Sequence, residues 1–255
     1  MKHIKLFETE ADYEAGKSSL ERPYVAYVRD SDSVYYMGDN IIEIVDPIAK
    51  EVAIANFDTD GDGELSKQEA LVVTDAAVLK SLFGNQSSIS ATETDLSFLK
   101  YFKNAKFPNA SNDYFRSCTY CTAFDFSDMD FSGVTSMARF FFYCRSVRYI
   151  GLRNLNLSNV TTFDSCFNLS SFDANLSVVI DFSGSTLPTG NVDFANIVLG
   201  QRDLTFLMNG CSSASVEVIK NAVHNNVYVG YFKIIVDGKK WTCSSAGGTW
   251  VESDV

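Results

Sequence analysis

The chain repeats the tetrapeptide Phe115-Arg116-Ser117-Cys118 as Phe141-Phe142-Tyr143-Cys144 and again as Phe167-Asn168-Leu169-Ser170, each time after 26 residues. The apolar residues between the copies keep the same offset. Phe124, Phe126, Met129, Phe131, Val134 and Met137 correspond to Ile150, Leu152, Leu155, Leu157, Val160 and Phe163. Such a unit predicts a coil made of a short strand, a turn and a short helical or irregular return.

A coil of this length cannot bury its own apolar face, so we expect consecutive coils to stack. Equivalent residues would then lie about 4.7–4.9 Å apart where strands pair. Phe126 is expected over Leu152, and Cys118 over Cys144. The open ends of the stack need caps, and the segments on both sides are the candidates.

The Phe-x-x-Cys anchor, the apolar run after it and Leu-Asn-Leu-Ser-Asn-Val-Thr at 155–161 resemble the BspA-like leucine-rich repeat surface proteins of gut bacteria and some protozoa. The resemblance is strong over 95–175 and weaker as far as Cys211. Aromatic residues replace many leucines here, and the third unit becomes irregular after Ser171. The resemblance implies a secreted adhesin that binds a host protein or glycan.

Residues 58–69, Asp-Thr-Asp-Gly-Asp-Gly-Glu-Leu-Ser-Lys-Gln-Glu, read as a complete EF-hand calcium loop. The predicted ligands are Asp58, Asp60, Asp62, the backbone carbonyl of Glu64, Ser66 and the bidentate carboxylate of Glu69. Four carboxylates this close would repel one another without a cation. The alternative is a solvated acidic loop. Because the loop is single, we expect a structural Ca²⁺ ion rather than a sensor. BspA-like proteins place one such loop just before the repeats, and residues 56–70 resemble that arrangement.

Residues 1–37 predict a small α+β unit with a strand at 4–7, a helix after Thr9 and a hairpin of 23–28 with 34–37. Arg-Pro-Tyr-Val-Ala-Tyr-Val at 22–28 resembles an N-terminal segment of proteins from phages that infect gut bacteria. That resemblance implies a virion protein, with an ordinary N-terminal cap as the alternative. The first residues do not form a Sec signal peptide as written.

The predicted fold is α/β: a leucine-rich-repeat solenoid with repeats of about 26 residues. Its predicted parts are an anchor unit (1–37), a calcium-loop helical cap (46–95), the repeats (96–211), and a C-terminal helix and β-hairpin cap (212–255). Asp46-Pro47 begins a helix, and Gly84-Asn85 ends another that starts at Asp75. Further strands are predicted at 178–182 and 197–199. Leu207-x-x-x-Cys211 is interpreted as a divergent return to the repeat anchor. A helix begins at Ser212 or Ser213, and Asp237-Gly238 makes the hairpin turn.

A net charge of −11 and a pI near 4.6 argue against binding to a nucleic-acid backbone. The sequence contains no run of 18 or more apolar residues, so no membrane-spanning helix is predicted.

The six cysteines leave three interpretations open: a ladder of buried thiols, disulfides between adjacent coils, or zinc at Cys118-x-x-Cys121. His3 and His224 have no motif neighbours, so we expect no enzymatic activity. A carboxylate pair for glycoside hydrolysis would depend on the fold.

The expected function is therefore non-enzymatic. The first hypothesis is a phage virion component, such as a fibre, spike or decoration protein, that contacts the host surface. The second is the secreted adhesin. Residues 1–37 are the predicted contact with other virion proteins or with a second copy, and the location is the virion surface or the extracellular space.

Overall fold

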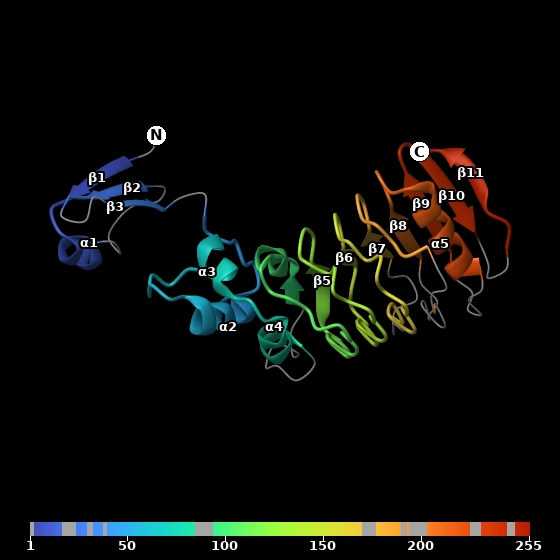
Figure 1. Cartoon of the computed structure of the whole chain (residues 1–255), viewed down its shortest axis with the longest axis horizontal. Coiled ribbons are helices and arrows are strands. Elements are labelled where there is room, and N and C mark those ends of the chain that lie inside the picture. Colours follow the sequence, from blue (N-terminus) through green and yellow to red (C-terminus); the bar gives the residue numbers. More distant parts are fainter. Residues whose placement is uncertain are drawn as a thin grey trace.

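The computed structural model describes residues 3–16, 24–29, 33–37, 40–84, 94–169, 177–189, 193, 203–224, 231–243 and 248–255. The molecule is elongated, with the N-terminal strands at one end and the C-terminal strands at the other (Figure 1). In the described part of the chain, no helix is both long and apolar enough to cross a bilayer.

Among its described residues, the N-terminal unit has a three-stranded sheet and the helix α1. It contains β1 (His3–Phe7), α1 (Glu10–Gly16), β2 (Tyr24–Val28) and β3 (Ser33–Met37). The strand order is β1-β2-β3, with β1 parallel and β3 antiparallel to β2. Phe7 and Val28 are buried within this unit and do not belong to the core of the rest of the chain.

Three helices follow: α2 (Pro47–Phe57), α3 (Lys67–Val72) and α4 (Ala76–Phe83). The prediction for the start of α2 is confirmed, because Asp46 Oδ1 accepts the Ala49 N–H at 2.7 Å and Pro47 occupies the first turn. Gly84 ends α4 without a left-handed conformation. It is required there for space, since a Cβ would overlap the Lys80 carbonyl oxygen. Asn85 lies outside the described residues.

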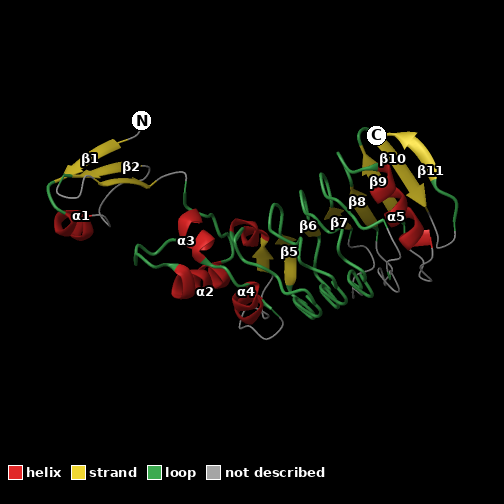
Figure 2. Cartoon of the chain, viewed as in Figure 1, coloured by secondary structure: helices red, strands yellow, loops and turns green. Residues whose placement is uncertain are grey.

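An eight-stranded sheet runs through the remaining chain (Figure 2). Its strands are β4 (Thr94–Leu96), β5 (Cys121–Asp125), β6 (Tyr149–Gly151), β7 (Val178–Asp181), β8 (Leu204–Leu207), β9 (Phe232–Val236), β10 (Lys239–Cys243) and β11 (Val251–Asp254). Neighbours from β4 to β9 are parallel, and β10 and β11 pair antiparallel. A 3₁₀ helix, η3 (Ser97–Tyr101), follows β4, and α5 (Ser213–His224) lies between β8 and β9.

The 26-residue interval of the sequence reappears as strand register. Phe124 pairs with Ile150, and on the return side of the coil Ser136 bridges both Ala110 and Thr162. The next step is longer, because Ile150 pairs with Ile180, 30 residues on. The four extra residues fall where the sequence repeat became irregular. The register therefore continues through the stretch in which the repeat is no longer recognisable.

The coils that begin with β5, β6, β7 and β8 each turn a corner three residues after the strand, through a residue with positive φ. Asp128, Asn154, Gly184 and Gly210 occupy this corner, with φ of 62°, 57°, 73° and 71°. Because the conformation recurs in successive coils, it belongs to the fold rather than to one functional site. Cys211 directly follows this corner, as Met129 follows Asp128. This corrects the interpretation of Cys211 as a return to the Cys118 anchor, which precedes its strand.

One apolar core extends from the helices through the coils to β10. The joint between helices and repeats is aromatic: the Phe57 and Phe102 rings lie 5.0 Å apart, and Phe83 and Phe98 5.3 Å. Since β9 pairs parallel with β8, the same sheet continues across the predicted boundary at 211. The turn at Asp237-Gly238 has positive φ at both residues, as predicted for this hairpin. The strand expected at 197–199 falls outside the described residues.

Candidate calcium site

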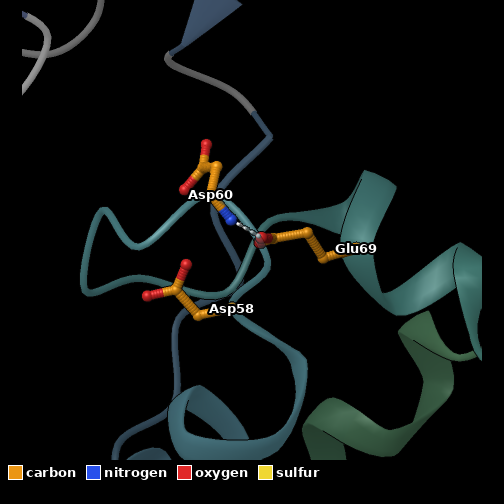
Figure 3. A group of neighbouring side chains, drawn as sticks. All are labelled: Asp58, Asp60 and Glu69. Atoms are coloured by element: carbon orange, nitrogen blue, oxygen red, sulfur yellow. Dashed lines mark hydrogen bonds between the residues drawn. The ribbon is translucent and has the colours of Figure 1, made fainter. Parts of the chain in front are cut away.

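The loop from Asp58 to Glu69 joins the end of α2 to the first turn of α3 (Figure 3). Gly61 and Gly63 have φ of 71° and 80°, and a Cβ added to either would meet nothing within 4 Å. Backbone conformation, rather than lack of space, therefore selects glycine at these turns. Leu65 is buried and fixes the exit of the loop to the core.

Three of the six predicted ligands come together. Ligand oxygens of Asp58, Asp60 and Glu69 all lie within 4.8 Å of one another. Figure 3 shows Glu69 reaching from α3 towards the loop that carries the two aspartates. Positions eleven residues apart in the sequence thus contribute to one cluster of oxygens.

The side chains of the other predicted ligands also contact neighbouring groups, as those of Asp58 and Asp60 do. Asp62 Oδ1 accepts the Glu64 N–H at 2.8 Å, and the Glu64 carboxylate pairs with Lys50 at 2.8 Å. Glu64 was predicted to offer only its backbone carbonyl, so this ion pair does not conflict with its role. Ser66 caps α3 and donates its hydroxyl to Glu69 Oε2 at 2.9 Å.

The carboxylate of Glu69 is the most constrained group of the cluster. Its Oε1 accepts the Thr59 N–H at 2.6 Å, and its Oε2 accepts the Ser66 N–H at 2.8 Å. Burial raises the pKa of Glu69, but these hydrogen bonds outweigh burial and bring the pKa below its ordinary value of 4.5. The carboxylate is therefore ionised at neutral pH.

These residues fit a hard cation. All predicted donors are oxygen atoms, which are the ligands that hard cations such as Ca²⁺ prefer. Asp58, Asp60 and Glu69 would hold a Ca²⁺ ion directly. When bound, the ion would supply a crosslink between the end of α2 and the start of α3.

A contact that the sequence did not reveal lies behind the loop. Ile41 and Ser66 form an antiparallel bridge, and the Ile42 N–H donates to the Leu65 carbonyl at 2.8 Å. No local pattern identifies this pairing, because its two sides lie more than twenty residues apart.

Asp125 and Asp181 are buried acidic residues that flank Arg153. Both lie beside Arg153, at 3.8 and 3.7 Å, and Asp125 also pairs with Lys100 at 3.2 Å. Tyr149 lies between them, and burial, followed by the two carboxylates, raises its pKa to about 12. The side chains of His3 and His224 are outside the described part of the structure.

The thiols of the repeats are placed against backbone carbonyls of preceding segments. Cys144 Sγ lies 3.1 Å from the Phe115 carbonyl oxygen, and Cys211 Sγ lies 3.1 Å from that of Phe182. Five of the six cysteines are buried, and Cys211 is half-buried. Of the three interpretations left open, this geometry favours the buried thiol ladder.

The chain matches no protein-family model, no curated protein and no solved structure. The resemblances to BspA-like surface proteins and to a phage N-terminal segment therefore stay predictions that rest on the quoted motifs.

Proposed function

We propose that this protein is a non-enzymatic, calcium-stabilised repeat protein of leucine-rich-repeat type that presents a regular surface to a partner. The observation that supports this most is the oxygen cluster of Asp58, Asp60 and Glu69 at the end of the coil stack. The ion would act on structure, because the loop joins the two helices that cover the first coil. Phe57, the last residue of α2, packs directly on Phe102 of the joint.

A row of half-buried side chains supports the display role. Ala123, Tyr149, Val179, Thr205 and Lys233 are in register across the five parallel strands β5 to β9. All five are neither fully buried nor fully exposed. They alternate with core residues such as Phe124, so they belong to the outer face of the sheet. A solenoid offers such a face for contact with a protein or a glycan.

Calorimetric titration with Ca²⁺ tests the calcium part of the proposal. We expect one site in the wild-type protein and loss of binding in Glu69→Gln. Glu64→Gln is the matched control, because Glu64 would contribute a backbone oxygen while its side chain pairs with Lys50. Wild-type protein without a binding signal would overturn the proposal.

Two settings remain candidates for the display role. The virion setting is proposed from the segment at 22–28, and the adhesin setting from the repeats. Co-sedimentation with purified phage particles separates them. Protein that sediments with particles supports the virion setting, whereas protein found only on bacterial surfaces or in the medium supports the adhesin.

A further inference from the structure

The exit of the calcium loop forms a short antiparallel pair with the segment that precedes α2. The Lys67 N–H donates to the Asn40 carbonyl at 2.6 Å, and the Ile42 N–H donates to the Leu65 carbonyl at 2.8 Å. Ile41 and Ser66 bridge between these two bonds. Residues 40–42 therefore lie along residues 65–67 as a two-stranded clip.

Residues 65–67, here called the strip, also contact the oxygen cluster. Ser66 donates its N–H to Glu69 Oε2 at 2.8 Å and its hydroxyl to the same oxygen at 2.9 Å. The side chain of Leu65 is buried at 1 % exposure. Ile42, which lies opposite Leu65, is buried to the same extent. One face of the strip thus holds the carboxylate that would bind the ion, and the other holds residues 40–42.

The position of residues 40–42 in the chain makes this contact consequential. They follow β3 and precede α2, so the chain path from the N-terminal sheet to the body passes through them. Figure 1 shows the N-terminal sheet at one end of the molecule, next to the helices. Residues 40–42 are therefore the first described residues after β3 that contact the body.

We propose that calcium fixes this clip: ion binding at Glu69 orders the strip 65–67, which in turn holds residues 40–42 to the body. This inference rests on the proposed calcium function. Coupling between the ion and the clip must be reciprocal, so weakening the clip lowers the affinity for calcium. Burial of Ile42 by itself would instead hold the segment equally well with and without the ion.

Amide hydrogen exchange in the full chain distinguishes these two cases. With saturating Ca²⁺, exchange at the Ile42 and Lys67 amides should slow at least about tenfold relative to chelator, because local opening then requires loss of the ion. The Phe126 amide, which donates to the Gly151 carbonyl in the repeats, is the internal reference and should change little. If calorimetry shows calcium binding but exchange at the Ile42 and Lys67 amides does not change, the coupling between calcium and the clip is refuted. The proposed calcium function then still stands. Absence of binding overturns both.

Lys67→Pro removes one bond of the clip selectively. Lys67 is the first residue of α3, where proline is favoured, and Ser66 before it has ψ of 158°, which proline requires of its predecessor. Lys67→Ala is the matched control, because it deletes the same side chain, including its contact with Tyr101, and keeps the N–H donor. The loss of one hydrogen bond should raise the Kd for calcium about two- to tenfold in Lys67→Pro. Equal Kd values for both variants, with wild-type circular dichroism, contradict the coupling.

Discussion

Arg153 Nη2 lies 3.8 Å from Oδ2 of Asp125, the residue that ends the preceding strand of the sheet. Its Nε lies 3.7 Å from Oδ2 of Asp181, which ends the following strand. One guanidinium thus links three successive coils. Gly151 makes the arrangement possible, because a Cβ there would overlap Asp125 Oδ1. Where the preceding and the following coil carry Asp-Phe-Ser, this one carries Gly-Leu-Arg.

Replacement of Arg153 by methionine should destabilise the protein by about 1–3 kcal/mol, because Asp125 stays buried with fewer positive partners. Urea unfolding measures the change. Lys239→Met is the control, since its partners Glu252 and Asp254 are exposed and such pairs contribute about 0–1 kcal/mol. Equal effects of the two substitutions would contradict a stabilising role for the guanidinium link.

Removal of calcium should lower the melting temperature without changing the fold. At a hundredfold excess over Kd, an ion bound only by the native state adds about 2.7 kcal/mol, which corresponds to roughly 5–10 °C for a chain of this size. Scanning calorimetry with calcium and with chelator measures the difference. Glu69→Gln should melt at the same temperature in both. A wild-type protein that ignores chelator would refute the structural ion.

The stability of the calcium-free protein should decrease in acid. The pKa of Glu69 is lower in the folded state than its ordinary value of 4.5. Its contribution to stability is therefore present above that value and is lost as pH falls through the folded-state pKa. Between about pH 5 and pH 3, Glu69→Gln should show a shallower fall in unfolding free energy than wild type. Asp113 supplies part of the remaining slope, because its hydrogen bond with Arg139 lowers its pKa. Parallel pH profiles would exclude this role of Glu69.

Thiol labelling should follow burial. Cys211 is half-buried and should react first in the native protein, whereas the fully buried Cys166 should react only after denaturation. Burial raises the pKa of Cys166, which suppresses the reactive thiolate. Intact mass spectrometry over a labelling time course measures the order. A native mass two hydrogens lighter under non-reducing conditions would reveal a disulfide instead.

Removal of residues 1–37 should leave a folded body that still binds calcium but no longer assembles with its partner or itself. The cut spares residues 40–42 and therefore the clip on the calcium loop. The N-terminal sheet has its own buried residues, Phe7 and Val28, and strands at its edges can pair with another chain. Sedimentation of the two forms measures assembly. Unchanged oligomer size after truncation argues against an anchor, and a clearly lower melting temperature indicates a covering role.

Local and periodic features could be predicted from the sequence. The 26-residue interval reappears as the pairing of Phe124 with Ile150, because parallel strands in stacked coils must keep equivalent residues in register. Asp46-Pro47 begins its helix because capping depends on a few neighbouring residues. Asp58, Asp60 and Glu69 come together as the loop pattern predicted, because all three lie within one continuous stretch of twelve residues.

Contacts between distant segments were decided only by the tertiary structure. The pairing of residues 40–42 with 65–67 has no local signature, because either side by itself is an ordinary polar and apolar stretch. Arg153 resembles any surface arginine until stacking brings Asp125 and Asp181 beside it. The coil between Ile150 and Ile180 is four residues longer than the preceding one, so the repeat cannot be recognised there from the sequence. The backbone pairing of Ile150 with Ile180 does not depend on the length of the segment that connects the two strands. Helix caps and the repeat interval depend on residues that are close in the sequence. The contacts of Arg153 and of residues 40–42, in contrast, form only when distant segments have packed together.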